Sequence, residues 1–286
     1  MMRVKYYGKS DIGKVRSANE DYFINEKLDN NEYVFVVADG MGGHNAGGIA
    51  SELGTLTFIN QYKYQRKKKK SIIDSMSFSI KKANETIYKK ALSDPKKSGM
   101  GTTFSACVIS KMKAYIVHVG DSRIYLIRDN DIKRVTTDHT FVEKMLEQGK
   151  ITDQEALHHP QKNILYMSLG VQKSFEPEII DDFNIKDDDV IVMCSDGLVN
   201  TVTNNQIKKF SLIYNPQESV EKLIKLANKN GGTDNITAQV IRINKTEGIR
   251  RLEPISIEKE NKKNSLILLL FIILTILFIL WLILTS

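Results

Sequence analysis

Seven short runs rich in Val, Ile, Tyr and Phe constrain the fold of this chain more than any other feature, because each has the length and composition of a β-strand. The runs cover residues 22–25, 33–38, 102–109, 114–119, 123–128, 190–194 and 236–243. They come in clusters and do not alternate one by one with helical segments. This order predicts an α+β fold of layered antiparallel sheets and argues against a doubly wound parallel sheet.

Helical patterns occupy the segments between these clusters. Apolar residues recur at i+3/i+4 spacing over 73–87 and 220–227, and residues 46–64 also predict a helix. Thr152 and Glu155 form a capping-box pattern that would open a short helix. The Asp-Asn-Asp turn at 129–131 predicts a hairpin over 123–135.

Five aspartates stand at the ends of predicted strands. Asp39, Asp121 and Asp196 follow apolar runs, and Asp21 and Asp234 precede them. A single aspartate of this kind is usually a turn residue, but five at strand ends can converge on one edge of a layered sheet. Crowded carboxylates repel one another, and a divalent cation removes that repulsion. Oxygen ligands without His or Cys suit Mg²⁺ or Mn²⁺ better than Zn²⁺.

The pattern therefore predicts a metal site in which Asp39 is a ligand. Such a site can hold two ions with a shared water and favour in-line displacement at phosphorus. Gly40 has no Cβ, so its carbonyl could reach a metal ion or the water on it.

The glycine-rich stretch VFVVADGMGGHNAGGIAS, residues 34–51, could instead cradle a phosphate. The GxGxxG spacing from Gly40 fails because Asn45 stands at the third glycine position. The GxxxxGK[ST] spacing from Gly42 fails because Gly48 and Ile49 replace the Lys and the Ser or Thr. Nucleotide binding by this loop is therefore not expected.

The two cysteines, Cys107 and Cys194, lie inside apolar runs and predict buried thiols. No pair of Cys or His has zinc-ligand spacing. Asn200 stands six residues after Cys194, where a cysteine-based phosphatase loop would place Arg.

Seven segments, in order and with ordinary spacing, resemble motifs of the metal-dependent Ser/Thr protein phosphatases, the type 2C or PPM family, in a bacterial form. They are DIGKVRSANEDYF (11–23), VVADGMGGHNAGGIAS (36–51), GMGTTFSACVI (99–109), VGDSRIYLI (119–127), TTDHT (136–140), CSDGL (194–198) and GGTDNITAQVI (231–241). One such segment alone would be weak evidence, whereas seven in sequence are specific. The resemblance covers roughly residues 5–243, so we expect a phosphatase domain over 1–243.

The resemblance implies a four-layer αββα sandwich in which two antiparallel sheets are flanked by helix pairs. It implies hydrolysis of phosphoserine and phosphothreonine on proteins, with two or three Mn²⁺ or Mg²⁺ ions. By position, Asp39 matches the carboxylate that bridges two metals, and Gly40 supplies a carbonyl. Asp196 and Asp234 match ligands of one metal. Asp21 matches the acid that anchors the other metal, mostly through water.

The resemblance also assigns residues around these metals. Asp121 matches a ligand of the third metal of bacterial members, and Arg16 matches the arginine that binds phosphate with its planar fork. His44 matches the general acid for the leaving alkoxide, but a loop histidine bonded to backbone is an open alternative. His139 is expected to be structural. Residues 141–175 match the flap beside the active site, where substrate choice would be tuned.

The C-terminal segment differs from the rest of the chain. Residues 265–286 carry no charge, and 266–284 are apolar apart from Thr275, which matches the ~20 residues that cross a bilayer. We therefore predict a polar linker at 244–264 and a single transmembrane helix at 265–284. Lysines 259, 262 and 263 flank the helix on its N-terminal side, so the positive-inside rule places the catalytic domain in the cytoplasm.

These features set the expected partners. The enzyme would act on phosphorylated proteins, in particular a membrane Ser/Thr kinase and its substrates, and would contact membrane lipid through the C-terminal helix. The net charge of +7 indicates attraction to anionic surfaces without identifying one, and we expect no nucleic-acid partner. The basic run RKKKK at 66–70 fits either a solvated loop or contact with lipid head groups.

Two other functions share this fold. A catalytically dead binding module would be expected to lack a metal ligand or Arg16, and all are present. A phosphatase that regulates one dedicated protein would differ in substrate and not in chemistry. The sequence leaves that second alternative open.

Overall fold

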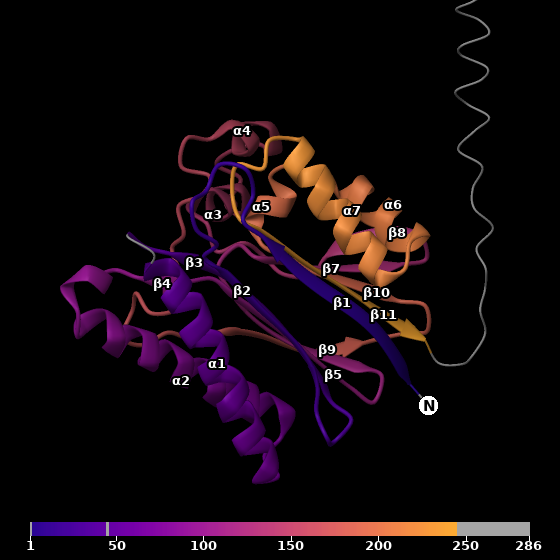
Figure 1. Ribbon diagram of the computed structural model, residues 1–286, viewed down its shortest axis with the longest axis horizontal. Helices are drawn as coiled ribbons and strands as arrows, with labels where there is room; N and C mark the ends of the chain where they lie inside the picture. Colours follow the sequence, from indigo (N-terminus) through magenta and orange to yellow (C-terminus); the bar gives the residue numbers. More distant parts are fainter. Residues whose placement is uncertain (1, 44–45, 245–286) are drawn as a thin grey trace, which may run out of the picture. The chain divides into compact units, whose positions relative to one another are not determined.

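The computed structural model describes residues 2–43 and 46–244. Residues Met1–Glu247 form one compact unit. Helices lie on both sides of a stack of strands, with α1 and α2 on one side and α6 and α7 on the other (Figure 1).

The first sheet is antiparallel throughout and joins the two ends of the described chain. Its order is β1 (Arg3–Asp11), β11 (Ile236–Asn244), β10 (Val190–Cys194), β7 (Arg123–Arg128) and β8 (Asp131–Arg134). Strand β1 pairs with β11 along its whole length, from Arg3 opposite Asn244 to Asp11 opposite Ile236. The hairpin predicted over 123–135 is formed by β7 and β8, which confirms it.

The second sheet is also antiparallel. Its order is β2 (Asp21–Lys27), β3 (Tyr33–Met41), β5 (Phe104–Ser110), β6 (Lys113–Val119) and β9 (Glu178–Asn184), and the short β4 (Gly101–Thr102) pairs with the end of β3. The sequence predicted one strand over 102–109, but the structure divides it at Thr103. The strand is interrupted at this residue because the Thr103 amide donates a 2.9 Å hydrogen bond to the backbone carbonyl of Asp39.

Three apolar layers hold these elements together. Strand β3 shows why, because Val34, Val36 and Ala38 face one layer while Phe35 and Val37 face the next. A strand that is buried on both faces needs a near-continuous apolar run, which is what 33–38 provides. The middle layer lies between the two sheets, and the outer layers lie under the helices.

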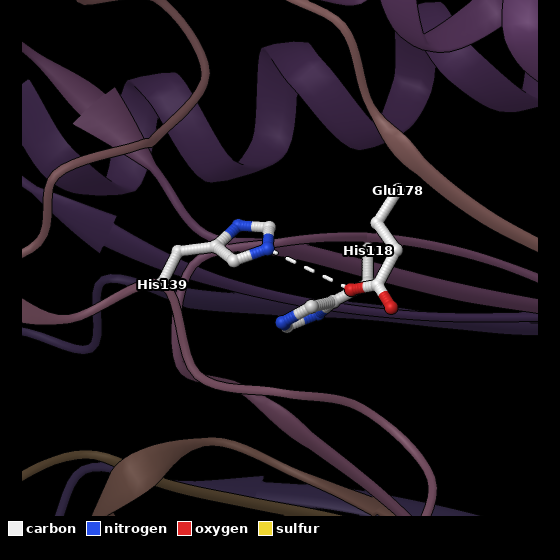
Figure 2. A group of neighbouring side chains, drawn as sticks. All are labelled: His118, His139 and Glu178. Carbon is white, nitrogen blue, oxygen red and sulfur yellow. Dashed lines mark ion pairs between the residues drawn. The ribbon is translucent and has the colours of Figure 1, made fainter. Parts of the chain in front are cut away.

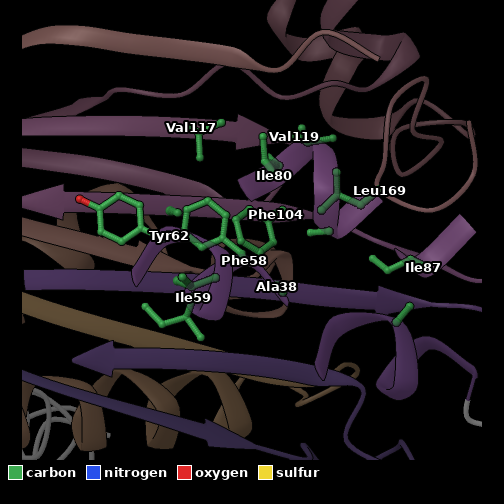
Figure 3. Close-up of a cluster of buried hydrophobic side chains, with 14 of the residues drawn as sticks. Ala38, Phe58, Ile59, Tyr62, Ile80, Ile87, Phe104, Val117, Val119 and Leu169 are labelled. Carbon is green, nitrogen blue, oxygen red and sulfur yellow. The ribbon is translucent and has the colours of Figure 1, made fainter. Parts of the chain in front are cut away.

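Helices α1 (Ala46–Lys67) and α2 (Ile72–Leu92) cover the second sheet. Their buried side chains meet those of the strands in the cluster drawn in Figure 3, where Phe58 lies 5.0 Å from Phe104 between ring centres. Helix α2 begins at an N-cap, because Ser71 Oγ accepts a 3.0 Å bond from the Asp74 amide.

Helices α5 (Asp196–Val199), α6 (Asn204–Ile213) and α7 (Pro216–Lys229) cover the first sheet. The predicted capping box is present at α4 (Asp153–His158), which follows α3 (Phe141–Glu147) in the flap region, and a 3-10 turn η1 (Pro95–Lys97) precedes β4. These layers confirm the predicted α+β arrangement of two antiparallel sheets flanked by helices.

The sequence missed two edge strands. Strand β1 alternates charged and apolar residues weakly, and β9 carries two aspartates, so neither shows a strong apolar run. Within the described ranges, no helix has the length and apolarity to cross a bilayer. The predicted span at 265–284, and all of the predicted linker except Asn244, lie outside those ranges.

Candidate metal centre

Two of the predicted carboxylates lie side by side at one edge of the second sheet. Asp21 opens β2 and is directly opposite Asp39 on β3. The Asp39 backbone is fixed on both sides, because its amide donates 2.9 Å to Thr103 Oγ1 and its carbonyl accepts from Thr102 Oγ1 and the Thr103 amide at 2.9 Å. The strand break at Thr103 therefore positions Asp39.

The first sheet presents two further carboxylates at the same edge. Asp196 follows β10 as the first residue of α5, and Asp234 precedes β11. The Ser195 amide donates 3.1 Å to the Thr237 carbonyl, which brings these two strand ends together.

Asp21 joins the two sheets. Its Oδ2 accepts bonds from Ser195 Oγ at 2.8 Å, directly after β10, and from Thr237 Oγ1 at 2.6 Å, on β11 of the first sheet. Its Oδ1 is buried without a hydrogen-bond partner in the described structure, and so is Oδ1 of Asp196. Such unpaired buried oxygens are costly unless a further group engages them.

Asp121 completes what we call the aspartate group (Asp21, Asp39, Asp121, Asp196 and Asp234). It lies in the turn between β6 and β7, where the chain passes from one sheet to the other. The structure thus brings all five predicted aspartates to one end of the sandwich. Four are partly exposed and Asp21 is buried, so the group is recessed but open to solvent.

Electrostatics show that these carboxylates act on one another. Burial raises the pKa of Asp39 well above its ordinary value, and the charges of Asp21, Asp196, Asp121 and Asp234 raise it further. Burial raises the pKa of Asp21 to about 7, although the Thr237 and Ser195 hydroxyls oppose the rise.

Asp121 and Asp196 follow the same pattern. Burial, then the Asp196 charge, raises the pKa of Asp121 to about 8. Burial, then Asp234, raises the pKa of Asp196. Carboxylates that resist ionisation in this way, with unpaired oxygens beside them, are the donors that a hard divalent cation stabilises. The residues present therefore fit Mg²⁺ or Mn²⁺.

Glycine at position 40 has a packing reason that the sequence did not reveal. A Cβ there would lie 2.1 Å from the Gly47 carbonyl oxygen and 2.6 Å from that of Glu20. The start of α1 therefore lies directly against the end of β3. The predicted role of the Gly40 carbonyl as a metal ligand stays a prediction.

Arg16 lies at the mouth of the aspartate group. Its Nη2 donates a 2.8 Å bond to Asp234 Oδ2, which raises the pKa of the guanidinium, and its side chain is 53% exposed. The structure thus brings Arg16, the residue predicted to bind phosphate, next to the predicted metal ligands. Its guanidinium is accessible to an incoming phosphate group. His44 lies outside the described residues, so its role as general acid stays a prediction.

Asn235 is a site residue that the sequence analysis missed. Its Oδ1 accepts from the Glu20 amide at 2.8 Å, and its Nδ2 donates to the carbonyls of Ile12 at 3.0 Å and Ala18 at 2.9 Å. It therefore fixes the loop that carries Arg16. The only signal for it was its position directly after Asp234.

Two hydrogen bonds between Gly120 and His139 hold the turn that carries Asp121, and we call this pair of bonds the histidine strap. The Gly120 amide donates 3.2 Å to His139 Nδ1, and the His139 amide donates 2.8 Å to the Gly120 carbonyl. His139 Nε2 lies 3.6 Å from Glu178 Oε2 (Figure 2). The Tyr166 amide, in the flap region, donates 3.0 Å to the His139 carbonyl. These bonds support the expectation that His139 is structural.

His118, His139 and Glu178 also form a compact set of potential metal ligands, with atoms within 4.8 Å of one another. Two contacts occupy His118, because Nδ1 lies 2.8 Å from Ser105 Oγ and Nε2 lies 3.0 Å from the Thr137 carbonyl. Burial lowers the pKa of His118 to about 4, so the ring is neutral and its two nitrogens are used within the fold. A metal ion here would have to break these bonds.

Comparisons with known proteins agree on one family. A family model described as protein phosphatase 2C matches residues 8–239. A putative protein phosphatase 2C-type of Streptococcus pyogenes serotype M6 is 39% identical over 250 residues, covering 84% of this chain and 98% of the relative.

Solved structures show the same similarity. The serine/threonine phosphatase PstP/Ppp of Mycobacterium tuberculosis has a TM-score of 0.76 at 31% identity, covering 85% of this chain and 99% of that chain. A structure of the catalytic domain of the phosphatase PstP in complex with two manganese ions has a TM-score of 0.75 at 30% identity, covering 86% and 100%.

Proposed function

The chain belongs to the protein phosphatase 2C family, and from that premise we propose that the aspartate group binds Mn²⁺ or Mg²⁺ and hydrolyses phosphoserine and phosphothreonine on proteins. Membership makes the chain a protein Ser/Thr phosphatase that depends on these metals. The observation that supports the proposed residues is the convergence of five aspartates: burial raises the pKa of Asp21, Asp39, Asp121 and Asp196, and Asp21 and Asp196 each carry an unpaired buried oxygen.

We assign most of the metal binding to Asp39, Asp196 and Asp234, with Asp21 at the junction of the sheets and the Gly40 carbonyl nearby. When bound, divalent ions supply the acidity that makes water a nucleophile at neutral pH and the charge that stabilises a transferring phosphoryl group. Among the described residues, the set of three or more potential ligands with atoms within 4.8 Å of one another is His118, His139 and Glu178, so the carboxylates of the aspartate group are spread more widely than that. We assign Asp121, on its own turn, to a separate ion.

Arg16 and His44 would act on the substrate. The exposed guanidinium of Arg16 can leave Asp234 and take two phosphate oxygens, so it binds the phosphoryl group in the ground state and the transition state alike. His44 would donate a proton to the leaving serine or threonine oxygen. Hydrolysis then releases the free hydroxyl side chain and inorganic phosphate, with water supplying the new oxygen.

We also place this activity at a membrane. The uncharged run 265–286, with lysines on its N-terminal side, supports a single C-terminal span and a cytoplasmic catalytic domain. Tethering raises the local concentration of membrane-bound phosphoproteins without changing the site. A membrane Ser/Thr kinase and its substrates are the proposed partners.

Residues 1–247 suffice to test the chemistry. We expect phosphate release from a phosphothreonine peptide in the presence of Mn²⁺ and none after chelation. A folded, manganese-loaded domain that releases no phosphate would refute the proposal and favour a binding module. A panel of phosphopeptides and a co-purified membrane kinase would separate a general phosphatase from one dedicated to a single protein.

The membrane part has its own test. Deletion of residues 264–286 should release the protein from the membrane fraction while kcat/KM on a small phosphopeptide stays nearly unchanged. Full-length protein found in the soluble fraction would contradict the proposed span.

A further inference from the structure

The turn after α1 concentrates positive charge. Residues 63–70 contain six cations and no acid. Helix α1 ends at Lys67 and α2 begins at Ile72, so most of the run 67–70 forms the connection between them. All four of these lysines are exposed, and we call residues 67–70 the basic tip.

The two cations that precede the basic tip are used within the fold. Lys63 Nζ lies 2.7 Å from Glu26 Oε1, and Arg66 forms a fork on the buried carboxylate of Glu32. Tyr62 also donates to Glu32, at 2.7 Å. These contacts anchor the end of α1 against the β2–β3 turn.

The lysines of the basic tip have no carboxylate within ion-pair distance in the described part of the chain. Lys68 Nζ lies 4.3 Å from the centre of the Tyr64 ring, which is half exposed. Cations in the last turn of a helix are favoured by its dipole, which explains Lys67. That effect does not explain Lys69 and Lys70, which follow the helix.

The basic tip lies at the opposite end of the domain from the aspartate group. Helix α1 starts against Gly40, beside Asp39, and its 22 residues extend for roughly 30 Å at about 1.5 Å each. Its far end meets the β2–β3 turn through Glu32. Figure 1 shows the far end of α1 and this turn on the side of the strands away from the β3 label.

The described chain also ends on that side. Strand β11 begins next to the aspartate group, where Thr237 bonds Asp21, and ends at Asn244. Its Ile243 belongs to the same apolar cluster as Tyr33 at the start of β3. Lys27 Nζ lies 5.7 Å from the Tyr33 ring, so the end of β11 and the β2–β3 turn share one end of the sandwich.

We propose that the basic tip docks on the anionic head groups of a lipid bilayer and holds the aspartate group facing away from it. The inference rests on the proposed membrane attachment and adds an orientation to it. Four exposed lysine amines at the turn between α1 and α2, with the Tyr64 ring beside one of them, suit the charged layer and interface of a membrane. The chain continues towards its apolar C-terminal run from the same end.

The basic tip suits general electrostatic attraction to an anionic surface, and it does not form a specific site for one lipid head group. The open pocket beside it, of about 420 Å³, is lined by Lys27, Lys63, Arg66 and Lys67 but also by Glu26 and Asp29. Mixed charges of this kind do not make a dedicated anion site. Binding should therefore follow the charge density of the lipid, and it should weaken as salt shortens the Debye length.

The test uses residues 1–247, because they form one compact unit and a solved catalytic domain that is matched over its whole length covers 86% of this chain. The domain is sedimented with vesicles of phosphatidylcholine alone or with about one third phosphatidylglycerol. The test variant replaces Lys67, Lys68, Lys69 and Lys70 by Gln. Since each lysine near an anionic surface contributes about 1 kcal/mol, or roughly five-fold, the variant should bind at least about 100-fold more weakly.

A charge-matched control separates docking from net charge. Lysines 209, 222, 225 and 229 are exposed on α6 and α7, at the other face of the sandwich, and their replacement by Gln removes the same four charges. This control should keep most of the vesicle binding. Equal losses in both variants, or no binding of the unmodified domain to anionic vesicles, would overturn the proposal.

Two further measurements complete the test. Phosphate release from a phosphothreonine peptide is followed in the same samples, so an active domain that ignores vesicles would refute the docking alone and leave the proposed chemistry intact. Polyglutamate is offered as an acidic protein-like partner. Binding of the basic tip to polyglutamate but not to vesicles would also overturn the proposal.

Discussion

Replacement of Asp21 by Asn should change how the stability of the metal-free domain depends on pH. The pKa of Asp21 is about 7 in the fold, against 3.8 in an unfolded chain. The folded state therefore binds this proton more tightly, so the fold loses stability as pH rises from about 4 to about 7. The difference of roughly 3 pH units, at about 1.4 kcal/mol each, corresponds to a loss of about 4 kcal/mol.

The assay is urea unfolding of residues 1–247 in chelator between pH 4.5 and 7.5. It is followed by circular dichroism, because the single tryptophan, Trp281, is outside this segment. The free energy of unfolding of the unmodified domain should fall as pH rises over this range. Asn at position 21 cannot ionise, so the fall in Asp21→Asn should be smaller by several kcal/mol. Asp29→Asn, at an exposed position on the β2–β3 turn, removes the same charge and should behave like the unmodified domain.

Manganese should reverse the trend, because metal binding needs ionised carboxylates and becomes stronger as pH rises. At pH 7.5 and a free concentration about 100 times Kd, the ion should stabilise the unmodified domain by about 2.7 kcal/mol, and Asp21→Asn by much less. The same pH dependence in Asp21→Asn and in the unmodified domain would refute the electrostatic reasoning.

Four further outcomes are expected. Asp39→Asn should lower turnover more than about 100-fold while the domain still folds; near-normal activity at saturating Mn²⁺ would contradict its assignment as a ligand. Arg16→Ala should raise KM for a phosphopeptide roughly ten-fold or more, the equivalent of one charge-assisted hydrogen bond, and an unchanged KM would count against phosphate binding. His139→Leu should cost about 1–3 kcal/mol of stability, because it leaves the Gly120 amide unpaired, whereas His139→Asn keeps an acceptor and should cost less; equal losses in urea unfolding would count against the strap. His44→Ala should reduce hydrolysis of alkyl phosphates more than of p-nitrophenyl phosphate, whose leaving group needs little protonation, and equal reductions would remove His44 from the general-acid role.

Much of the fold could be predicted because it depends on local patterns. Strands β7 and β10 were predicted with the bounds that the structure has, since their apolar residues are continuous and turn residues bound them. Helices α2 and α7 follow from the spacing of their apolar residues, and the capping box of α4 from two residues; α1 was also predicted, over 46–64. Edge strands β1 and β9 were missed because a strand covered on only one side tolerates polar residues, which weakens the pattern.

The sequence alone also determined that five carboxylates would stand at strand ends, and their motif order pointed to one family. It could not determine how those ends meet. Asp21 reaches Ser195 and Thr237 across 174 and 216 positions, and Asn235 reaches the loop that holds Arg16 across 215 or more. Contacts of this kind depend on strand register and on the packing of one sheet on the other, which no local pattern encodes.

At Gly40, too, the sequence determined one part of the role and the tertiary structure determined the other. The sequence marked it as a position where backbone must come close to another group. Only the tertiary structure identifies the start of α1 as that neighbour, because the distance to Gly47 is set by how the helix packs on the second sheet. The sequence thus determined which groups take part in this site, and the packing of two sheets and a helix decided which atoms they meet.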